Sequence, residues 1–451
     1  MTRRRLGFLA LVVGLTGAAV AGTDTVASPA ARAGKPNILF VLTDDQAYRG
    51  TIAKMPWLHS HRRSFTRFQH AYVNNALCCP SRATILSGRY SHHTHVETTY
   101  DGPKLDARRT IATWLHRAGY QTALFGKYLN HYPFGRGAFK PPGWDVFSAF
   151  GKVTGYFDYR LRTPEGDWEH HGSKARDYST RVLGNKARQF INTSPTPFFA
   201  YIAPYGPHSG KHSQFATPDP RDRHRFEHAR VHLPGNFNRI AKDAPRFWRD
   251  RGPVSRRTAI RAQRRAWATL LSEDRMLKML YGALRSRGVL RNTVIVFFSD
   301  NGFSFGSHRW TRKSCAYEEC IHVPFLIRAP RMSHRTVRAI VGNQDIAPTL
   351  TALAGVPHPR VDGSSLVPLM KGRRSSLHRP MLLRHKSARG EHLPSFWGLR
   401  TRDWKFVKQS NGERELYNLR GDPGELRNLA RTRRGVARRL ARELAQVKRS
   451  G

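Results

Sequence analysis

Five short, mostly apolar runs recur along the chain with helix-like stretches between them, and this alternation constrains the fold more than any other feature. Each run has five to seven residues and is bounded by turn or polar residues, as expected of strands that are buried on both faces. Strands that alternate with helices build an α/β fold with a mainly parallel sheet. The predicted strands are residues 36–42, 121–125, 197–203, 293–299 and 323–328, and helical spacing is clearest at 111–118 and 262–284.

Polar side chains follow four of these predicted strands, at the point where each strand ends. In an open α/β sheet, ligands bind at the carboxyl ends of the strands, so polar residues there indicate a site and not a core. The residues are Asp44 and Asp45, Lys127, His208, and Asp300 and Asn301.

Four members of this set, Asp44, Asp45, Asp300 and Asn301, offer only oxygen ligands. Such ligands suit a hard divalent cation, calcium or magnesium, whereas zinc favours His and Cys. An isolated Asp after a strand is usually explained by a helix cap or a turn. Two pairs at equivalent strand ends favour the metal site over that explanation.

Residues 77–88, Leu-Cys-Cys-Pro-Ser-Arg-Ala-Thr-Ile-Leu-Ser-Gly, hold two of the four cysteines side by side. The run from Ala83 predicts the opening of a helix. A thiol at a helix start beside the Arg82 guanidinium is expected to have a lowered pKa and to be reactive. The alternative is a buried, inert pair, because free Cys is among the most buried residue types.

A cluster of cations is expected around such a metal. It suits a tetrahedral oxyanion, sulfate or phosphate, because it stabilises the charge that an in-line displacement places on the equatorial oxygens. No ordinary nucleophile with an adjacent base is evident among these residues. The expected cations are Arg82, Lys127, His208 and Lys313.

At these positions the chain resembles the formylglycine-dependent sulfatases. Cys78-Cys79-Pro80-Ser81-Arg82 matches their C-x-P-S-R signature, and the resemblance extends over roughly residues 36–430. The form Gly-Lys-Tyr-Leu-Asn at 126–130 is similar to the branch that includes N-acetylglucosamine 6-sulfatases. Further matching segments are 43–46, 299–302, 306–308 before Lys313, 343–349, 362–363 and 402–423.

The resemblance implies an alkaline-phosphatase-like fold, with a large, mostly parallel central sheet between helices and a smaller C-terminal α+β subdomain. It also implies that a formylglycine-generating enzyme oxidises Cys78 to formylglycine, while Cys79 stays a thiol. One hydroxyl of the hydrated aldehyde then attacks sulfur and displaces the alcohol. The second hydroxyl is deprotonated, and sulfate leaves as the aldehyde re-forms.

The resemblance assigns a role to each candidate residue. The divalent cation, with calcium favoured over magnesium, would be bound by Asp44, Asp45, Asp300, Asn301 and the modified Cys78. Arg82 would stabilise the hydrate, and the sulfate oxygens would be held by Lys127 and Lys313. His208 would protonate the leaving alcohol, and His308 would contact substrate, unless it is a surface histidine. One departure stands out: many members have a histidine two residues beyond the motif lysine, and this chain has Leu129 there. Asn130 or His131 could replace it.

The N-terminus resembles an export signal, because three arginines precede an apolar run that is followed by Ala31-Arg32-Ala33, an A-x-A cleavage site. The arginines also suit a twin-arginine signal. We therefore expect a secreted or cell-envelope protein with no integral membrane segment after cleavage. The expected organisation is a signal peptide (1–33), a catalytic domain (36–370) with a basic, loop-rich excursion (209–265), and a smaller C-terminal subdomain with a basic terminal helix (371–451).

The charge balance is extreme, with 77 basic and 31 acidic residues and a formal net charge of +46. Such a field favours polyanionic partners, although an arginine-rich composition alone could produce it. Nucleic acid is the weaker expectation, because no zinc-finger spacing or RNA-binding aromatic signature is present. Cys315 and Cys320 are close enough in sequence to bridge a small loop, and the sequence leaves open whether they do.

Three functional readings follow. The leading one is an exported sulfatase that acts on a sulfate ester, such as an N-acetylglucosamine 6-sulfate unit of a polyanionic glycan. A phosphodiesterase or phosphonate monoester hydrolase of the same superfamily is the alternative among enzymes. A non-catalytic polyanion-binding protein is the alternative outside them.

Overall fold

The computed structural model describes residues 34–132, 140–151, 154–163, 165–210, 213–388 and 393–449. By their contacts, residues Lys35–Gly451 form one unit. The predicted signal peptide, residues 1–33, lies outside the described residues. None of the described helices combines the length and the apolar character that crossing a membrane requires.

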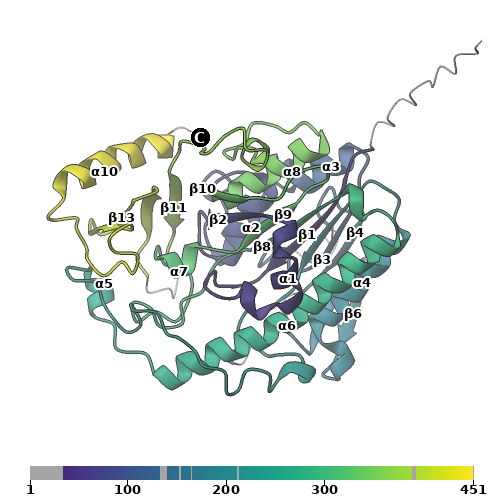
Figure 1. Ribbon diagram of the computed structural model, residues 1–451, viewed down its shortest axis with the longest axis horizontal. Coiled ribbons are helices and arrows are strands. Elements are labelled where there is room, and N and C mark those ends of the chain that lie inside the picture. Colours follow the sequence, from purple (N-terminus) through teal and green to yellow (C-terminus); the bar gives the residue numbers. More distant parts are fainter. Residues whose placement is uncertain are drawn as a thin grey trace, which may run out of the picture. The chain divides into compact units, whose positions relative to one another are not determined.

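The described residues contain fourteen strands, which build two larger sheets and one small hairpin (Figure 1). The strands are β1 (Asn37–Thr43), β2 (Thr66–Tyr72), β3 (Gln121–Gly126), β4 (Val146–Ala149), β5 (Tyr159–Arg162), β6 (Trp168–His171), β7 (Phe198–Ala203), β8 (Thr293–Ser299), β9 (Phe325–Arg328), β10 (Thr336–Gly342), β11 (Met381–His385), β12 (Phe396–Arg400), β13 (Trp404–Gln409) and β14 (Arg414–Asn418).

The α-helices of the described residues vary widely in length. They are α1 (Pro56–His61), α2 (Cys78–Ser87), α3 (Ile111–Arg117), α4 (Ser179–Thr193), α5 (Arg246–Arg249), α6 (Arg256–Ser286), α7 (Glu318–Ile321), α8 (Ile346–Ala354), α9 (Val367–Met370) and α10 (Arg434–Arg449).

The large sheet has the order β10-β2-β9-β8-β1-β7-β3-β4. β9 is antiparallel to both of its neighbours, and all other adjacent pairs are parallel. The prediction of an α/β fold with a mainly parallel sheet is therefore confirmed. All five strands predicted from apolar runs (β1, β3, β7, β8 and β9) lie next to one another in the centre or close to it, where both faces are covered.

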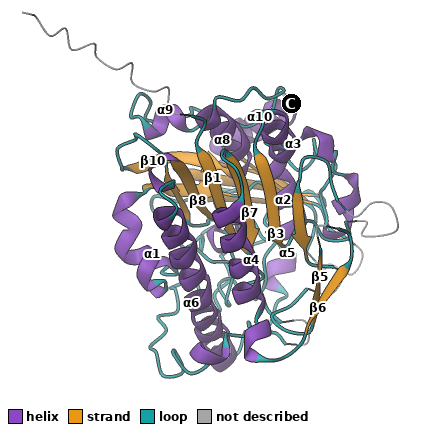
Figure 2. Cartoon of the chain, turned by 90° about the vertical axis from the view of Figure 1, so that its right-hand side faces the viewer, coloured by secondary structure: helices purple, strands orange, loops and turns teal. Residues whose placement is uncertain are grey.

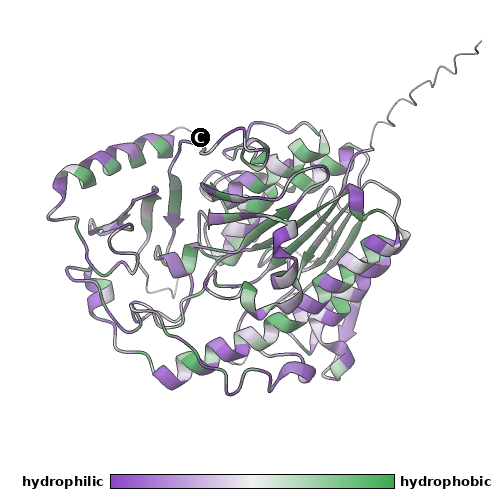
Figure 3. Ribbon diagram, viewed as in Figure 1, coloured by the Kyte–Doolittle hydropathy of each residue, from purple (hydrophilic) through white to green (hydrophobic). Residues whose placement is uncertain are grey.

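Alternate residues of the central strands supply two hydrophobic cores, one on each face of the sheet. Ile38 and Phe40 of β1 pack with α2, α3 and α8, whereas Leu39 and Val41 pack with α1, α4 and α6. Figure 2 shows helices on both sides of the sheet, and Figure 3 shows the hydrophobic character of its strands. This two-sided burial explains why the strands read as continuous apolar runs.

The second sheet is antiparallel, with the order β11-β12-β13-β14. Helix α10 covers one face of it through Leu440 and Leu444, which pack against Leu399 and Phe406. Its strands come from the segment in which the sequence predicted a smaller C-terminal α+β unit with a basic terminal helix.

One predicted boundary is wrong. The loop-rich excursion was expected to extend to residue 265, but helix α6 already begins at Arg256, with the Ser255 hydroxyl accepting the N–H of Thr258 at its start. The last proline of the excursion is Pro253, so nothing after it prevents a helix. The basic residues 256–265 therefore lie on a long helix and not in a loop.

Candidate active site

The carboxyl ends of β1 and β8 bring the two predicted pairs of oxygen ligands together. Thr43 and Ser299 are partners in adjacent parallel strands, so the residues that follow them emerge side by side. The N–H of Asp45 donates to Oδ1 of Asp300 at 3.1 Å, and Nδ2 of Asn301 donates to Oδ1 of Asp45 at 2.7 Å. Asp45 adopts a left-handed backbone conformation with φ of 66°, an unusual one for a residue other than glycine.

The chain reaches Cys78 through the loop after β2, and Cys78 is the first residue of α2. The helix thus starts five residues before the predicted opening at Ala83. Cys78 is only 4% exposed, and its Sγ lies 3.1 Å from Oδ1 of Asp44 and 3.7 Å from Oδ1 of Asp45. The predicted nucleophile position and the predicted metal ligands are therefore in contact.

Three cations surround this group. Arg82 is completely buried and places Nε 2.8 Å from Oδ2 of Asp300. Lys127, directly after β3, forms an ion pair with Asp44. Lys313 places Nζ 2.7 Å from both Sγ of Cys78 and Oδ1 of Asp45.

Gly126 allows Lys127 to enter the cluster. Its φ of 111° favours glycine, and a Cβ there would lie 2.1 Å from the carbonyl oxygen of Ala203. The close approach of β3 to β7 at this point therefore requires a glycine immediately before the lysine.

His208 lies in the loop after β7, at the edge of the cluster. Its side chain is 23% exposed, and Nε2 lies 3.6 Å from Oδ2 of Asp45. Nδ1 lies 2.7 Å from the carbonyl oxygen of Ser209, so a proton on Nδ1 donates to that oxygen and Nε2 is left to face Asp45.

The nine residues Asp44, Asp45, Cys78, Arg82, Lys127, His208, Asp300, Asn301 and Lys313 form what we call the strand-end cluster. Burial alone would raise the pKa of the Asp44 carboxyl, but Lys127, His208 and Arg82 hold it well below its usual range. Burial and the neighbouring Asp44 raise the pKa of Asp300 to about 6. The two carboxyls thus differ in how firmly they hold a negative charge.

The expected lowering of the Cys78 pKa is wrong in direction. Burial raises the pKa of the thiol well above its usual value, and the carboxylates of Asp300 and Asp44 raise it further. These effects exceed the opposing influence of Lys127 and Lys313. The unmodified thiol is therefore not an activated thiolate.

The donor set fits a hard divalent cation. Oδ2 of Asp45 and Oδ1 of Asn301 are buried and have no hydrogen-bond partner, a costly situation unless a cation binds them. Ligand atoms of Asp44, Asp45, Cys78 and His208 lie within 4.8 Å of one another. The residues predicted to hold calcium or magnesium, Asp44, Asp45, Asp300, Asn301 and residue 78, thus lie together, and their binding of an ion stays a prediction.

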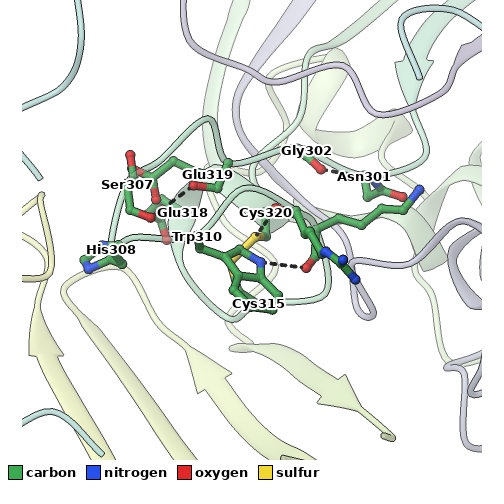
Figure 4. Close-up of a disulfide and its surroundings, with 12 residues drawn as sticks. Asn301, Gly302, Ser307, His308, Trp310, Cys315, Glu318, Glu319 and Cys320 are labelled. Carbon is green, nitrogen blue, oxygen red and sulfur yellow. Dashed lines mark hydrogen bonds between the residues drawn. A yellow bond between two sulfur atoms is a disulfide. The ribbon is translucent and has the colours of Figure 1, made fainter. Parts of the chain in front are cut away.

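His308 is not part of this cluster. It is 1% exposed, stacks on Tyr317 with ring centroids 3.7 Å apart, and lies 3.1 Å from Nδ2 of Asn236 through Nε2. It is thus neither a surface histidine nor a lining residue of the pocket beside the cluster. In Figure 4, His308 and Asn301 lie on opposite sides of the Cys315–Cys320 disulfide, whose formation the sequence left open.

Neither Leu129 nor the two residues suggested to replace the missing histidine, Asn130 and His131, has a described hydrogen bond to Cys78 through its side chain. Leu129 is buried in the hydrophobic core, and His131 is exposed and packs against Tyr100. On the side of Cys78 that faces the neighbouring pocket, the contacting side chain is Lys313.

A pocket of about 450 Å³ opens beside the cluster and is bordered by Asp45, His208 and Lys313. Sequence reasoning missed several of its other lining residues, because they come from separate segments without a local motif. They include Phe303, Phe305, Trp310, Arg312, His385 and Leu393. Phe303 and Phe305 stand just after the matching segment 299–302, and Arg312 stands next to Lys313, so these three had a sequence neighbour that marked the site.

Two family models match the chain. The first is described as sulfatase and matches residues 36–356. The second is described as the C-terminal part of N-sulphoglucosamine sulphohydrolase and matches residues 306–450.

Curated relatives point in the same direction. The chain is 34% identical over 364 residues to a putative extracellular sulfatase Sulf-1 homolog of Caenorhabditis elegans, covering 74% of this chain and 49% of that protein. It is 33% identical over 366 residues to N-acetylglucosamine-6-sulfatase of Homo sapiens, covering 75% of this chain and 65% of that protein. The chain thus spans less than two thirds of the length of either relative.

Solved structures share the fold. The structure of a protein in complex with its substrate D-glucosamine-2-N,6-O-disulfate matches with a TM-score of 0.81 and 24% identity, covering 92% of this chain and 97% of that chain. A phosphonate monoester hydrolase of Agrobacterium radiobacter matches with a TM-score of 0.75 and 20% identity, covering 92% and 95%. The fold alone therefore does not separate sulfate esters from phosphorus esters.

Proposed function

The chain belongs to the sulfatase family, and from that premise we propose that it is an exported hydrolase of sulfate esters on a glycan, with N-acetylglucosamine 6-sulfate as the preferred unit. One observation carries the proposal. Cys78 is packed between the carboxylates of Asp44 and Asp45 and the ammonium of Lys313, beside buried oxygens that lack a partner. This arrangement supports binding of a cation and of a tetrahedral oxyanion at residue 78.

We further propose that Cys78 is converted to formylglycine and that calcium is the bound cation. Together these groups would supply an activated oxygen nucleophile that the ordinary side chains of the site lack. Asp44, Asp45, Asp300 and Asn301 would hold the cation.

The cations have separate tasks in this proposal. Arg82 is completely buried against Asp300 and donates to the carbonyl oxygen of Lys127 at 2.7 Å, so it orients these groups and does not reach the pocket. Lys313 is partly exposed beside Sγ of Cys78 and borders the pocket, so it can bind a sulfate oxygen directly. Lys127 supplies the second positive charge next to Asp44.

His208 is positioned to handle the proton of the leaving group. Its Nδ1–H donates to the carbonyl oxygen of Ser209, which fixes the ring and leaves Nε2 toward Asp45 and the pocket. A proton held on Nε2 can pass to the alcohol oxygen as the S–O bond breaks.

The pocket supports a sugar substrate. Its volume of about 450 Å³ lies in the range of small-molecule sites, and its lining combines the aromatic rings of Phe303, Phe305 and Trp310 with the charge of Arg312. This mixture suits a ring with an apolar face and a sulfate group. The similarity to N-acetylglucosamine-6-sulfatase supports the choice of sugar.

Two measurements test the proposal. Mass spectrometry of the tryptic fragment 68–82 should show residue 78 with sulfur and two hydrogens lost and one oxygen gained. Turnover of an aryl sulfate and of N-acetylglucosamine 6-sulfate should fall at least about 1,000-fold in Cys78→Ala but persist in Cys79→Ala. An unmodified thiol in an active preparation would refute the mechanism.

The same preparation separates the related activities. Hydrolysis of an aryl phosphodiester faster than of the aryl sulfate would replace the sulfatase proposal with a phosphodiesterase or phosphonate hydrolase. Binding of sulfated glycan with no turnover of either ester would indicate a polyanion-binding protein.

Export and domain organisation complete the proposal. The arginines before the apolar run at the N-terminus support cleavage near Ala33 and delivery to the cell envelope or beyond, and the extracellular relative supports the same location. Sequencing of the mature N-terminus tests it. We keep residues 36–370 as the proposed catalytic domain and 371–451 as the proposed C-terminal subdomain, consistent with its separate antiparallel sheet.

A further inference from the structure

A second hollow of the molecule is strongly basic. It is a groove of about 690 Å³ at the first part of α6, where it faces the segment around residue 223. Within the described residues it is lined by six arginines and a single carboxylate, Glu227. The arginines are Arg223, Arg256, Arg257, Arg261, Arg264 and Arg265.

The arginines of α6 follow the helical repeat. Arg257, Arg261 and Arg264 are separated by four and three residues, so they lie on one face of the helix. From Arg256 to Ala268, the last helical residue that lines the groove, the basic face extends for about 18 Å at 1.5 Å per residue. The groove is therefore longer than a single sugar ring.

The opposite face of the same turns lines the pocket beside the strand-end cluster. Thr258, Ala259 and Ala262 border that pocket. Phe215, another lining residue of the pocket, packs against the Arg261 guanidinium, 4.9 Å from the ring centroid. Helix α6 with Phe215 is thus a common wall between the pocket and the groove.

The protein itself does not neutralise this charge. Within the described residues, none of the six arginines forms an ion pair with a carboxylate, and Glu227 pairs with His224 instead. Four of the arginines are exposed, and Arg264 and Arg265 are half-buried. Like charges at helical spacing destabilise a helix, so this row is unfavourable for the fold alone.

We propose that this groove binds a sulfated polysaccharide chain outside the catalytic pocket, so that the enzyme holds a polymer while one unit enters the pocket. The inference rests on the proposed function for the identity of the polymer. Guanidinium groups match the paired oxygens of sulfate groups along such a chain. The shared wall allows one flexible chain to occupy the groove and the pocket together.

Binding and catalysis can be measured separately. Full-length protein with Cys78→Ala is titrated with a heparin oligosaccharide, and the dissociation constant is measured over a range of salt concentrations. The variant R223Q/R256Q/R257Q removes three exposed charges of the groove. We expect binding at least tenfold weaker and a salt slope smaller by about 2, at about 0.7 per contact with a flexible polyanion.

A matched control, K278Q/R285Q/R291Q, removes two exposed charges near the other end of the same helix and a third from the turn that follows it. It should bind the oligosaccharide like the parent. With Cys78 present, the groove variant should keep its kcat/KM for a small aryl sulfate and lose it for the polymer. A loss of kcat/KM for both substrates, with the dissociation constant of the oligosaccharide unchanged, would contradict polymer binding in the groove.

Three results would overturn the inference. Equal weakening in both triple variants would show that only net charge matters. Tighter binding of a single-stranded oligonucleotide of the same charge would assign the groove to nucleic acid. Competition by glucosamine 6-sulfate monosaccharide at concentrations that saturate the pocket would place the polymer in the pocket alone. If the aryl sulfate is not turned over at all, the proposed function fails while the binding result still stands.

Discussion

Two of the buried clusters of charged side chains in the described part of the chain differ in how fully their charges are paired. The strand-end cluster has three carboxylates and three cations, yet Oδ2 of Asp45 and Oδ1 of Asn301 have no hydrogen-bond partner. The second cluster, which we call the joint cluster, consists of Glu318, Arg400, Lys405 and Glu425.

The joint cluster connects α7 to the C-terminal sheet. Nζ of Lys405 lies 2.9 Å from Oε1 of Glu318 and 2.7 Å from Oε1 of Glu425. The N–H of Glu318 donates to Oε2 of Glu425 at 2.9 Å, and Arg400 lies 3.3 Å from Oε2 of Glu318. Nζ of Lys405 and Oε1 of Glu425 do not meet at a hydrogen-bonding angle, but every carboxylate oxygen of this cluster lies within 3.3 Å of a cationic nitrogen or an N–H. Its charges are therefore already paired inside the protein, whereas Oδ2 of Asp45 accepts no hydrogen bond and lies 3.6 Å from Nε2 of His208.

Buried charge alone therefore does not identify a site. A metal and a sulfate bring opposite charges, so the strand-end cluster can accept both and stay balanced. The joint cluster is balanced and has its contacts already. Removing a charge should therefore cost stability in the joint cluster and mainly activity in the strand-end cluster.

The largest effect is expected from Lys405→Met. Breaking a buried ion pair by removing one partner leaves an uncompensated charge and costs about 3 to 5 kcal/mol of unfolding free energy. Urea denaturation measures this loss, and the double variant K405M/E425Q should recover part of it. The protein that remains folded should keep its kcat. An unfolding free energy for K405M equal to that of the wild type would show that the joint cluster does not stabilise the fold.

Lys313→Met should show the opposite pattern. Loss of one positive group that stabilises developing charge lowers kcat by about 100- to 1,000-fold. Its stability should change much less than that of Lys405→Met, because Lys313 is partly exposed. The readouts are kcat on an aryl sulfate and the urea midpoint. A variant that unfolds like K405M would show that Lys313 is mainly structural.

Calcium should stabilise one cluster only. At a free concentration 100 times the dissociation constant, binding to the folded state adds about 2.7 kcal/mol. Chelation should therefore lower the melting temperature of the wild type and of Lys405→Met, but not that of Asp45→Ala. If chelation lowers the melting temperature of Asp45→Ala by the same amount, the ion binds outside the strand-end cluster.

A smaller, pH-dependent effect is expected beside the joint cluster. Burial lowers the pKa of His308 to about 4, and Lys405 lowers it further while Glu319 opposes this. The unfolded state therefore takes up the proton first as the pH falls, so the stability from neutral His308 is present above about pH 6.5 and is lost toward pH 4.

For this single group the loss between pH 7 and pH 5 is roughly 2 kcal/mol. Denaturation of the wild type and of His308→Gln at both pH values measures it. The variant should have a shallower decline, although other buried histidines such as His322 keep part of it. An identical decline in both proteins would contradict the assignment.

How much the sequence could predict depends on how local each feature is. The central strands and the polar residues after them are encoded in short segments, because a strand buried on both faces must be apolar and its end must turn. The strands β2 and β10 were not predicted, since they mix polar and apolar residues and include exposed positions.

The site was only partly accessible from sequence for the same reason. Lys313 and Cys78 are 235 residues apart, and although both were expected near the metal, nothing in the sequence showed that their side chains touch. His308 was misjudged because its stacking on Tyr317 cannot be read from its neighbours in the chain. The pKa direction of Cys78 depends on burial, which the helix-start argument did not include.

The burial of Cys78 determines whether its modification can follow folding or must precede it. A side chain that is 4% exposed cannot be reached by another enzyme once the core has closed over it. If residue 78 is converted as proposed, the conversion must therefore come before folding is complete. A chain that folds before the conversion would keep an inactive thiol at residue 78. The yield of active protein would therefore depend on the rate of Cys78 oxidation relative to the rate of folding.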